Sequence, residues 1–464
     1  MIGRRSCFSR ICHSILTRAR FVQMAATIDT SPPIFRLTPG SSFDPSVFTR
    51  SIPVLAARIP AAKTTTLTKQ NPLKRFVLDI PRIRSVVSDP EDPNKRLVLL
   101  RVPHKYDLPQ EAQEFLDAET EKVFLHYVEL DYSYWTADDI LQAILPEDLG
   151  DGSPSSFTIT GHLAHFNLRE EYLPYKHIIG KIVLDKNKGL RTVVNKLDNI
   201  DNEFRFFKME VLAGEPDFVV EAHESGCRFK FDFSQVYWNS RLHSEHERLV
   251  TMFNPSDVIA DVFAGVGPFV VPAAKKGCAV FGNDLNPNSA KYMTQNAEEN
   301  KVGNRVRVSC QDGRQFIKQV VYEAWHNPFP ALVGPVKSHK QAERDDRKRR
   351  NHKLPDPSPP RRRIDHFVMN LPGTALEFLD AFRGSFASIR DEVGFGEVYN
   401  VMPMIHCHCF TRELERLRAE TDIRERAENA LGHGLEDVKY HFVRKVAPNK
   451  DMYCLSFRLP SSIT

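Results

Sequence analysis

The sequence predicts an α/β protein whose C-terminal half, residues 226–464, has a Rossmann-type fold with a mostly parallel sheet. Three segments carry this prediction: a glycine loop at Asp261–Phe269 (DVFAGVGPF), an acidic turn at Asn283–Pro287 (NDLNP) and a polar turn at Met369–Pro372 (MNLP). Each segment lies at or just after the end of a short apolar run, as expected of buried parallel strands. Because ligands bind at the carboxyl ends of such strands, the three turns together predict a nucleotide-cofactor pocket.

The first element is the strand at Asp257–Phe263 with the loop behind it. Gly265 and Gly267 let the loop backbone approach a ligand closely, which a side chain at either position would obstruct. Residues 269–274 then begin a helix. The loop lacks the third glycine of dinucleotide sites, so an NAD pocket is disfavoured. Taken alone, the loop is as consistent with a tight strand–helix turn that binds nothing.

The second element is an apolar strand at Cys278–Phe281, which ends near Asp284. This carboxylate follows Asp261 by 23 residues, close to the spacing at which Rossmann-type pockets present an acid to a ribose. A third strand-like segment, Val306–Cys310, is followed by another acid, Asp312. The order of strands and acids therefore favours a nucleoside-containing ligand.

The fourth element is a strand-like run at Ile364–Met369 that ends at Asn370. The Asn370 amide offers both a donor and an acceptor, and Pro372 stiffens the backbone after it. This combination suits a site that grips the edge of a planar base. The alternative is an ordinary junction between a strand and a turn.

These motifs and several others occur in the order of one known family. The chain resembles the eukaryotic and archaeal tRNA (guanine(37)-N(1))-methyltransferases from about Phe43 to the C-terminus. The additional segments that carry the resemblance are VYWNSRL at 236–242, SEH at 244–246, VAPNK at 446–450, and, in the middle of the chain, 161–168, 176–181 and 204–215. One departure is Ser240, where many relatives carry proline.

The resemblance implies a class I methyltransferase domain that methylates N1 of guanosine-37 in tRNA. Because N1 must lose a proton while negative charge gathers on O6, the reaction needs a base and a nearby donor. By resemblance, Glu245 is the base, Arg205 stabilises O6, and Asn370 and Pro372 complete the guanine pocket. Glu245 follows Ser244 at an expected helix start, which keeps the carboxylate ionised but lowers its basicity.

The same resemblance implies S-adenosylmethionine as the cofactor. This cofactor supplies an electrophilic methyl group, so the protein mainly has to position and polarise the reactants. The positions that match the cofactor site are Tyr237, His246, Asp261, Gly265, Gly267, Asp284, Leu285, Asp312, Gly313 and Asn370.

Two other functional classes remain open. A related methyltransferase could act on rRNA or on a protein glutamine, where an Asn-Pro-Pro-Tyr motif replaces Asn-Leu-Pro; Gly373 after Pro372 disfavours this option. A non-catalytic RNA-binding scaffold could retain the fold. The residues that argue against a scaffold are Arg205, Glu245, Asp284 and Asn370.

No metal site is predicted. His406–Cys409 (HCHC) resembles a ligand cluster, but alternation on a strand allows only two of the four side chains to converge. The eight cysteines contain no CxxC pair, which favours reduced thiols inside the cell.

Length and composition indicate several domains, since 464 residues exceed what one core usually holds. We expect a targeting segment at 1–33, an accessory tRNA-recognition domain at 34–130, an α+β middle domain at 131–225 and the methyltransferase domain at 226–464. Strands are expected at 156–160 and 181–185, and a structural amphipathic helix at 411–418. We expect no membrane span, because no apolar run approaches ~20 residues, and a monomer by resemblance.

Positive charge is concentrated in two segments. Residues before Asp29 hold five arginines and no acid, as in a mitochondrial transit peptide, and Met24 would allow a second start for cytoplasmic and nuclear forms. Residues 328–363 form an expected disordered basic insertion, with eleven Lys or Arg and four acids between Lys337 and Arg363. The insertion could contact tRNA phosphates, serve as a nuclear address or be solvated.

Overall fold

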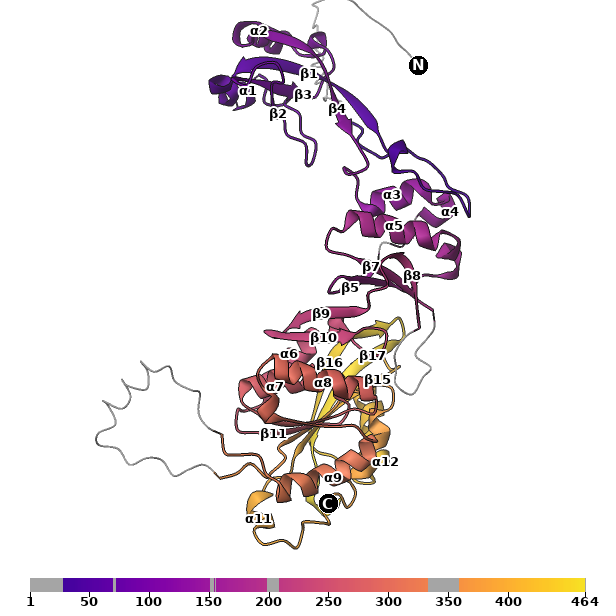
Figure 1. Cartoon of the computed structure of the whole chain (residues 1–464), viewed down its shortest axis with the longest axis vertical. Helices are drawn as coiled ribbons and strands as arrows, with labels where there is room; N and C mark the ends of the chain where they lie inside the picture. The colour runs from indigo at the N-terminus through magenta and orange to yellow at the C-terminus, as the bar shows by residue number, and fades with distance from the viewer. Residues whose placement is uncertain are drawn as a thin grey trace, which may run out of the picture. The chain divides into compact units, whose positions relative to one another are not determined.

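The computed structural model describes residues 28–69, 72–150, 154, 156–197, 208–332 and 359–463. The chain divides into two compact units, Met1–Ser155 and Ser156–Thr464 (Figure 1). Each unit has its own sheets and core. Within the described residues, no helix combines the length and apolar character that a membrane span requires.

The first unit is built on a four-stranded sheet in the order β2-β3-β1-β4. The long central strand β1 pairs antiparallel with both β3 and β4, and Ala57 and Ile59 of β1 pack with Leu100 and Leu116 in the core. The elements are η1 (Pro45–Val47), β1 (Arg50–Pro60), η2 (Ala61–Lys63), α1 (Thr64–Lys69), β2 (Val86–Ser88), β3 (Lys95–Leu100), η3 (Lys105–Asp107), α2 (Gln110–Glu119), β4 (Lys122–Leu130), α3 (Ala137–Ile144) and α4 (Glu147–Gly150).

The second unit begins with a four-stranded sheet in the order β5-β6-β7-β8, followed by a hairpin of β9 and β10. Strands β6 and β7 are parallel, and the other pairs are antiparallel. The elements are β5 (Thr158–Thr160), β6 (Leu163–Phe166), η4 (Glu170–Tyr175), α5 (Lys176–Lys186), β7 (Thr192–Lys196), β8 (Met209–Gly214), β9 (Val219–Glu224) and β10 (Cys227–Asp232).

Helix α5 replaces the strand expected at 181–185, and that prediction was wrong. Ile179, Ile182 and Val183 are buried at helical spacing, so the apolar run belongs to one face of a helix. Gly180 lets this face lie close to β8, because a Cβ at Gly180 would come within 2.6 Å of the Leu212 Cβ. The β-branched residues therefore pack on a sheet instead of joining it.

The larger part of the second unit is a seven-stranded sheet in the order β13-β12-β11-β14-β15-β17-β16. Neighbouring strands from β13 to β15 are parallel, and β17 runs antiparallel to both β15 and β16. The strands are β11 (Val258–Asp261), β12 (Ala279–Asn283), β13 (Val306–Ser309), β14 (His366–Met369), β15 (Met404–Thr411), β16 (Glu436–Ala447) and β17 (Lys450–Arg458). The expected α/β class with a mostly parallel sheet is confirmed.

Helices cover both faces of this sheet. One hydrophobic cluster joins the sheet to α6, α7 and α8, and another joins it to α9, η7 and α12. The helices are η5 (Ser240–Leu242), α6 (His243–Met252), α7 (Val270–Lys276), α8 (Pro287–Glu299), η6 (Gly303–Arg305), α9 (Gly313–His326), η7 (Ala375–Phe382), α11 (Phe395–Val398), α12 (Arg416–Leu431) and η8 (Ser461–Ile463).

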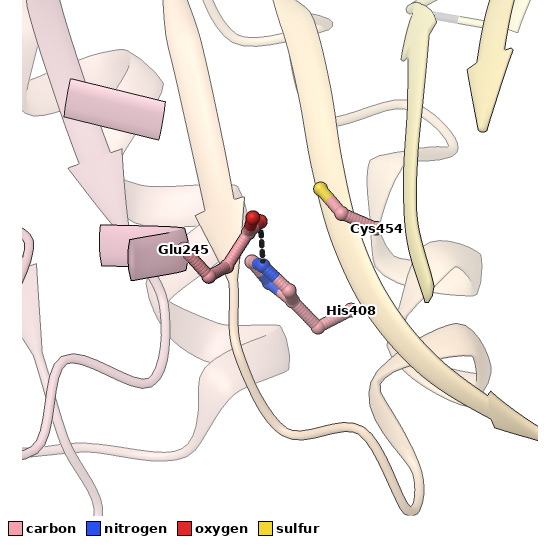
Figure 2. Close-up of side chains that lie close together, drawn as sticks. All are labelled: Glu245, His408 and Cys454. Carbon is pink, nitrogen blue, oxygen red and sulfur yellow. Dashed lines mark hydrogen bonds and ion pairs between the residues drawn. The ribbon is translucent and has the colours of Figure 1, made fainter. Parts of the chain in front are cut away.

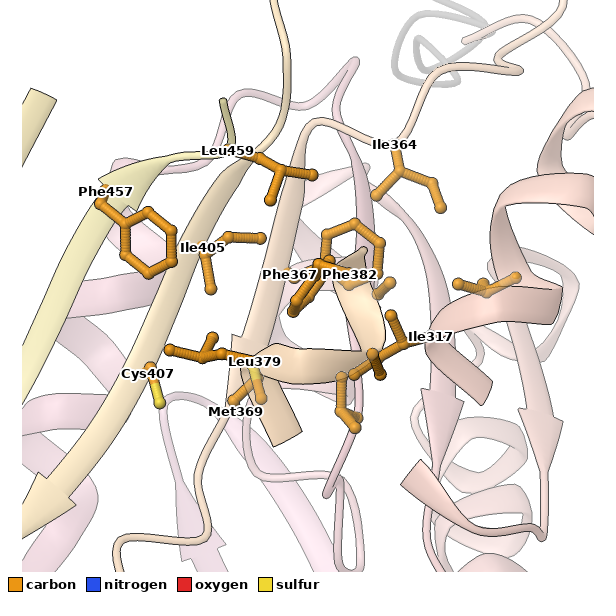
Figure 3. Close-up of a cluster of buried hydrophobic side chains, with 14 of the residues drawn as sticks. Ile317, Ile364, Phe367, Met369, Leu379, Phe382, Ile405, Cys407, Phe457 and Leu459 are labelled. Atoms are coloured by element: carbon orange, nitrogen blue, oxygen red, sulfur yellow. The ribbon is translucent and has the colours of Figure 1, made fainter. Parts of the chain in front are cut away.

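Buried aliphatic and aromatic side chains form the core between the sheet and η7 (Figure 3). Phe367 of β14 and Phe382 of η7 are fully buried, with ring centroids 4.9 Å apart at an interplanar angle of 87°. Ile317 and Ile405 complete the cluster from α9 and β15. Edge-to-face packing of this kind fixes η7 beneath the carboxyl end of β14.

The helix expected at 411–418 begins later in the structure. Strand β15 continues to Thr411, and α12 begins only at Arg416. The Phe410 amide donates to the Pro372 carbonyl at 3.0 Å, which extends the strand past its partner β14. Strand pairing in the sheet therefore outweighs the charge pattern that suggested a helix.

The ends of the expected basic insertion belong to the fold. Phe329 is 2% exposed in the core, and its backbone exchanges two hydrogen bonds with Arg361, of 3.1 and 2.9 Å. The expected bounds 328–363 are therefore too wide at both ends, because core burial and pairing hold these residues. Residues 333–358 lie outside the described part of the chain.

Candidate active site

A pocket of about 500 Å³ lies at the carboxyl ends of β11, β12, β13 and β14. Strand order reverses between β11 and β14, which is the position where open α/β sheets bind ligands. Eight residues expected at the site line this pocket: Tyr237, Gly265, Asp284, Leu285, Asp312, Gly313, Asn370 and Pro372. Sequence reasoning gave no site role to other lining residues, among them Phe263, Asn283, Phe378, Phe410, Arg444 and Met452.

The glycine loop and the acidic turn hold each other in place. The Gly265 amide donates to Asp284 Oδ2 at 2.8 Å, and the Asn286 amide donates to Asp284 Oδ1 at 2.9 Å. Gly265 has φ of +55°, a left-handed conformation that favours glycine. Burial raises the pKa of Asp284, although hydrogen bonds from Asn286, Gly265 and Ser289 oppose this shift. The carboxylate is therefore oriented before any ligand arrives.

Asn283 joins three strand ends beneath the pocket. Its Nδ2 donates to the carbonyls of Val262 and Gln311 at 3.1 and 3.0 Å. Its Oδ1 accepts from the Ser309 hydroxyl and the Gln311 amide at 3.0 and 3.1 Å. A single amide thus fixes the ends of β11, β12 and β13, a role that its place in the NDLNP motif did not reveal.

Two of the expected glycines serve packing. Gly267 has φ of +96°, and a Cβ there would lie 3.1 Å from the Val271 side chain; it does not line the pocket. At Gly313, which does line the pocket, a Cβ would come within 2.9 Å of the Phe263 ring. Gly313 therefore lets α9 begin directly against the glycine loop.

Asp261 and His246 do not line the pocket. His246 is 3% exposed; its Nδ1 hydrogen-bonds to Glu224 and its ring packs against Phe269. Asp261 is fully buried and accepts from the Phe263 amide at 3.3 Å. Both side chains are therefore directed into the protein interior and not toward the pocket.

The carboxyl of Asp261 provides a test of this buried environment. Burial raises its pKa to about 8, and the charge of Asp284 adds to this shift. A folded-state pKa above the unfolded value means that stability falls as pH rises from about 4 to about 8. We expect Asp261→Asn to remove this contribution, so the difference in unfolding free energy between variant and wild type should change between about pH 5 and about pH 8. Urea unfolding at both values checks this, and an unchanged difference would contradict it.

Asn370 lines the pocket and carries a buried acceptor. Within the part of the chain that the structure describes, its Oδ1 is buried and has no hydrogen-bond partner. A buried unpaired carbonyl is costly, so such a group indicates a ligand donor. The Pro372 carbonyl accepts from the Phe410 amide, which fixes the turn after Asn370 against β15.

Glu245 lies in the first turn of α6, as expected, but it does not line the pocket. It is 3% exposed. Arg248 donates from Nε to Oε2 at 2.6 Å and from Nη2 to Oε1 at 2.8 Å, and His408 Nε2 lies 2.8 Å from Oε1 (Figure 2). His441 Nε2 is 3.5 Å from Oε2. Burial alone would raise the pKa of Glu245, but the bonds from Arg248 and His408 lower it to about 2.

The strand register places the histidines beside Glu245 two residues along β17 from the positions that line the pocket. Phe410 and Arg444 line the pocket, and both pair with Met452. The next inward-facing position on β17 is Cys454, which pairs with His408 and His441, the two histidines beside Glu245. Two residues along a strand span ~7 Å. The Glu245 carboxylate therefore lies next to the part of the pocket that Phe410 and Arg444 line. Glu245 itself does not line the pocket, whereas Asn370 does.

Arg205, the expected O6 partner, lies outside the described residues.

Among the described residues, Glu245, His408 and Cys454 have ligand atoms within 4.8 Å of one another. Arg248 already supplies positive charge to Glu245. Although burial lowers the pKa of His408, Cys454 and Glu245 raise it to about 10, and a protonated imidazole cannot ligate a metal.

Along β15, His406 and His408 alternate with Cys407 and Cys409, which pack in the opposite core, as the strand interpretation predicted.

The strand order and the pocket at its switch point define the fold of the class I, S-adenosylmethionine-dependent methyltransferases. Residues 220–325 match the family described as TRM5/TYW2 methyltransferase domain, and residues 137–217 match the TYW2 N-terminal domain. The chain belongs to the tRNA (guanine(37)-N(1))-methyltransferase family.

Similar proteins of that name occur in Coprinopsis cinerea, 54% identical over 94% of this chain and 97% of the relative, and in Schizosaccharomyces pombe, 44% identical over 91% and 94%. Among solved structures, Trm5b from Pyrococcus abyssi is 23% identical with a TM-score of 0.56, covering 87% of this chain and 98% of that chain. A complex of aTrm5 and tRNALeu is 16% identical with a TM-score of 0.57, covering 88% and 100%. These structures share the fold.

Proposed function

We propose that this protein methylates N1 of guanosine-37 in tRNA and uses S-adenosylmethionine as the methyl donor. The observation that carries the proposal is the buried Oδ1 of Asn370, a residue of the switch-point pocket, which has no hydrogen-bond partner among the residues that the structure describes. Guanine presents N–H donors at its 2-amino group, and one of these would satisfy this acceptor while the N1–H proton passes to another group. The names of the fungal relatives support the same substrate.

The pocket fits the proposed cofactor. Asp284, held by two backbone amides, is the acceptor for the ribose hydroxyls, and Gly265 leaves the loop open beside it. Phe263, Leu285 and Phe378 provide apolar surface for an adenine ring. When bound, S-adenosylmethionine supplies an electrophilic methyl group. The remaining work of the chain is to orient guanine and accept a proton.

Glu245 is the proposed proton acceptor. As the N1–H bond breaks, its proton passes to a Glu245 oxygen, and the electron pair stays on guanine for the new N1–methyl bond. Because Arg248 now binds both Glu245 oxygens, the reaction requires this arginine to release one of them. Arg205 remains the proposed O6 donor by family resemblance.

A second pocket, of about 290 Å³, favours an RNA substrate. It shares Tyr237 and Arg444 with the first pocket and is also lined by His165, Lys196 and Arg241. Burial lowers the pKa of Lys196 to about 8, and the positive charge of Arg241 adds to this effect. A phosphate would relieve this repulsion, so a nucleotide could place its base in one pocket and its backbone near the other.

The proposal is tested by methyl transfer from labelled S-adenosylmethionine to unmodified tRNA carrying G37 and to the same tRNA carrying A37. We expect label in the G37 tRNA alone. Equal transfer to both would contradict the proposed base, and cofactor binding without transfer to any tRNA would favour an RNA-binding scaffold. Transfer to rRNA or to a protein glutamine would indicate a related methyltransferase.

We also propose the four-part division at 1–33, 34–130, 131–225 and 226–464, a monomer, and a mitochondrial form with cytoplasmic and nuclear forms from Met24. Residues 1–27 lie outside the described structure. Sequencing the N-termini of the protein from mitochondrial and cytosolic fractions tests the localisation. Two different termini are expected, and one shared terminus would count against two forms.

A further inference from the structure

His408 forms a buried hydrogen bond with the Glu245 carboxylate. It lies on β15, 163 residues from Glu245 in the chain, and its Nε2 is 2.8 Å from Glu245 Oε1 (Figure 2). The side chain of His408 is 0% exposed. It shares a strand face with Phe410, which lines the pocket two residues later. His408 therefore connects the buried carboxylate to the floor of the pocket.

The two strong partners of Glu245 differ in exposure to solvent. The Arg248 side chain is 27% exposed, so its guanidinium can turn toward solvent without losing hydration. His408 is enclosed by the sheet and by Phe269, with ring centroids 5.8 Å apart. When Arg248 releases the carboxylate, His408 can still hold Oε1, which leaves Oε2 to accept a proton.

We propose that His408 is a positioning residue for methyl transfer. It fixes the orientation of Glu245 and keeps the carboxylate ionised while Arg248 releases one of the two carboxylate oxygens. This inference rests on the proposed function, in which Glu245 takes the N1 proton. The charged or titratable groups facing Glu245 are Arg248 of α6, His408 of β15, Cys454 of β17 and His441 of β16. His408 in turn acts on Asp261 of β11 through its charge.

A double-mutant cycle tests the inference. Single-turnover rates with G37 tRNA are measured for wild type, His408→Gln, Glu245→Gln and the double variant. We expect His408→Gln to slow transfer about tenfold, because glutamine keeps an N–H donor but lacks the positive charge that strengthens the hydrogen bond to Glu245. The same change should have no further effect when Glu245 is already glutamine, because residues that act as a unit are not additive.

His406→Gln is the matched control. His406 is two residues earlier on the same strand face and equally buried, but it bonds to Ser456 at 2.8 Å and His366 at 3.0 Å. We expect this variant to keep the rate within about twofold of wild type. If His408→Gln does not fold, His408→Phe keeps the packing against Phe269, lacks the donor and carries the same test.

The pH dependence gives a second readout. His408→Gln removes a positive charge that stabilises the Glu245 anion, so the acidic limb of the pH–rate profile should move to higher pH in His408→Gln and stay in place in His406→Gln. Equal slowing by His408→Gln in both Glu245 backgrounds, or an unmoved limb, would overturn the inference. If Glu245→Gln itself does not slow transfer, the proposed role of Glu245 fails; if it does and His408→Gln has no effect, only the inference fails.

Discussion

Replacing Glu245 by glutamine is expected to slow methyl transfer to G37 tRNA by about 10²–10⁴-fold, the usual contribution of a positioned general base. Glutamine has nearly the same size and can still accept hydrogen bonds from Arg248 and His408, but it cannot take a proton from N1. Because the substitution keeps the size of the side chain and its capacity for hydrogen bonds, the affinity for tRNA should be unchanged. Single-turnover rates and tRNA binding are the two measurements.

Glu247→Gln is the control for this experiment. Glu247 lies on the same helix and is exposed, and it forms an ion pair with His243 at 3.9 Å. Its rate should match wild type. A Glu245→Gln rate within about threefold of wild type would remove Glu245 as the base, since general bases contribute far more. Equal losses in both variants would indicate a general effect of charge on α6.

The second large effect is expected at the cofactor pocket. Asp284→Ala removes a carboxylate that two backbone amides orient and that we assign to the ribose hydroxyls. Two hydrogen bonds to a charged acceptor are together worth about 3 kcal/mol, so S-adenosylmethionine should bind about 100-fold more weakly. Isothermal titration calorimetry measures the change directly.

The matched control is Glu323→Ala. This variant removes an exposed carboxylate of α9 that lies 3.9 Å from its ion-pair partner, Arg307. Cofactor affinity should be unaffected by this variant, and tRNA affinity should be unaffected by either. Full retention of cofactor binding in Asp284→Ala would show that the nucleoside lies elsewhere in the pocket. Loss of tRNA binding together with the cofactor would instead indicate a disrupted fold.

The sequence predicted well the end of the sheet that carries the pocket, because each part is encoded locally. Apolar runs of buried strand residues end at Asp261, Asn283 and Met369, and parallel strands bring those ends to one edge. Glu245 was also placed correctly in the first turn of a helix. Local apolar runs and turn residues were sufficient for these features.

The surroundings of Glu245 could not be predicted in the same way. His408 and His441 reach it through the register of β15, β17 and β16, which a single sequence does not specify. The apolar run in α5 was ambiguous for the same reason, since burial at Ile182 and Val183 suits a strand or a helix until the neighbouring sheet is known. Long-range pairing, rather than local preference, decided both cases.

The most direct test of the account is the identity of the methylated nucleoside. Unmodified tRNA should be incubated with the full-length protein and S-adenosylmethionine, digested, and analysed by mass spectrometry, with fragment mapping to locate the product. The account predicts 1-methylguanosine, formed at position 37 and strongly reduced with Glu245→Gln. A methyl group on another atom, on another nucleotide or on no nucleotide of the tRNA would contradict it.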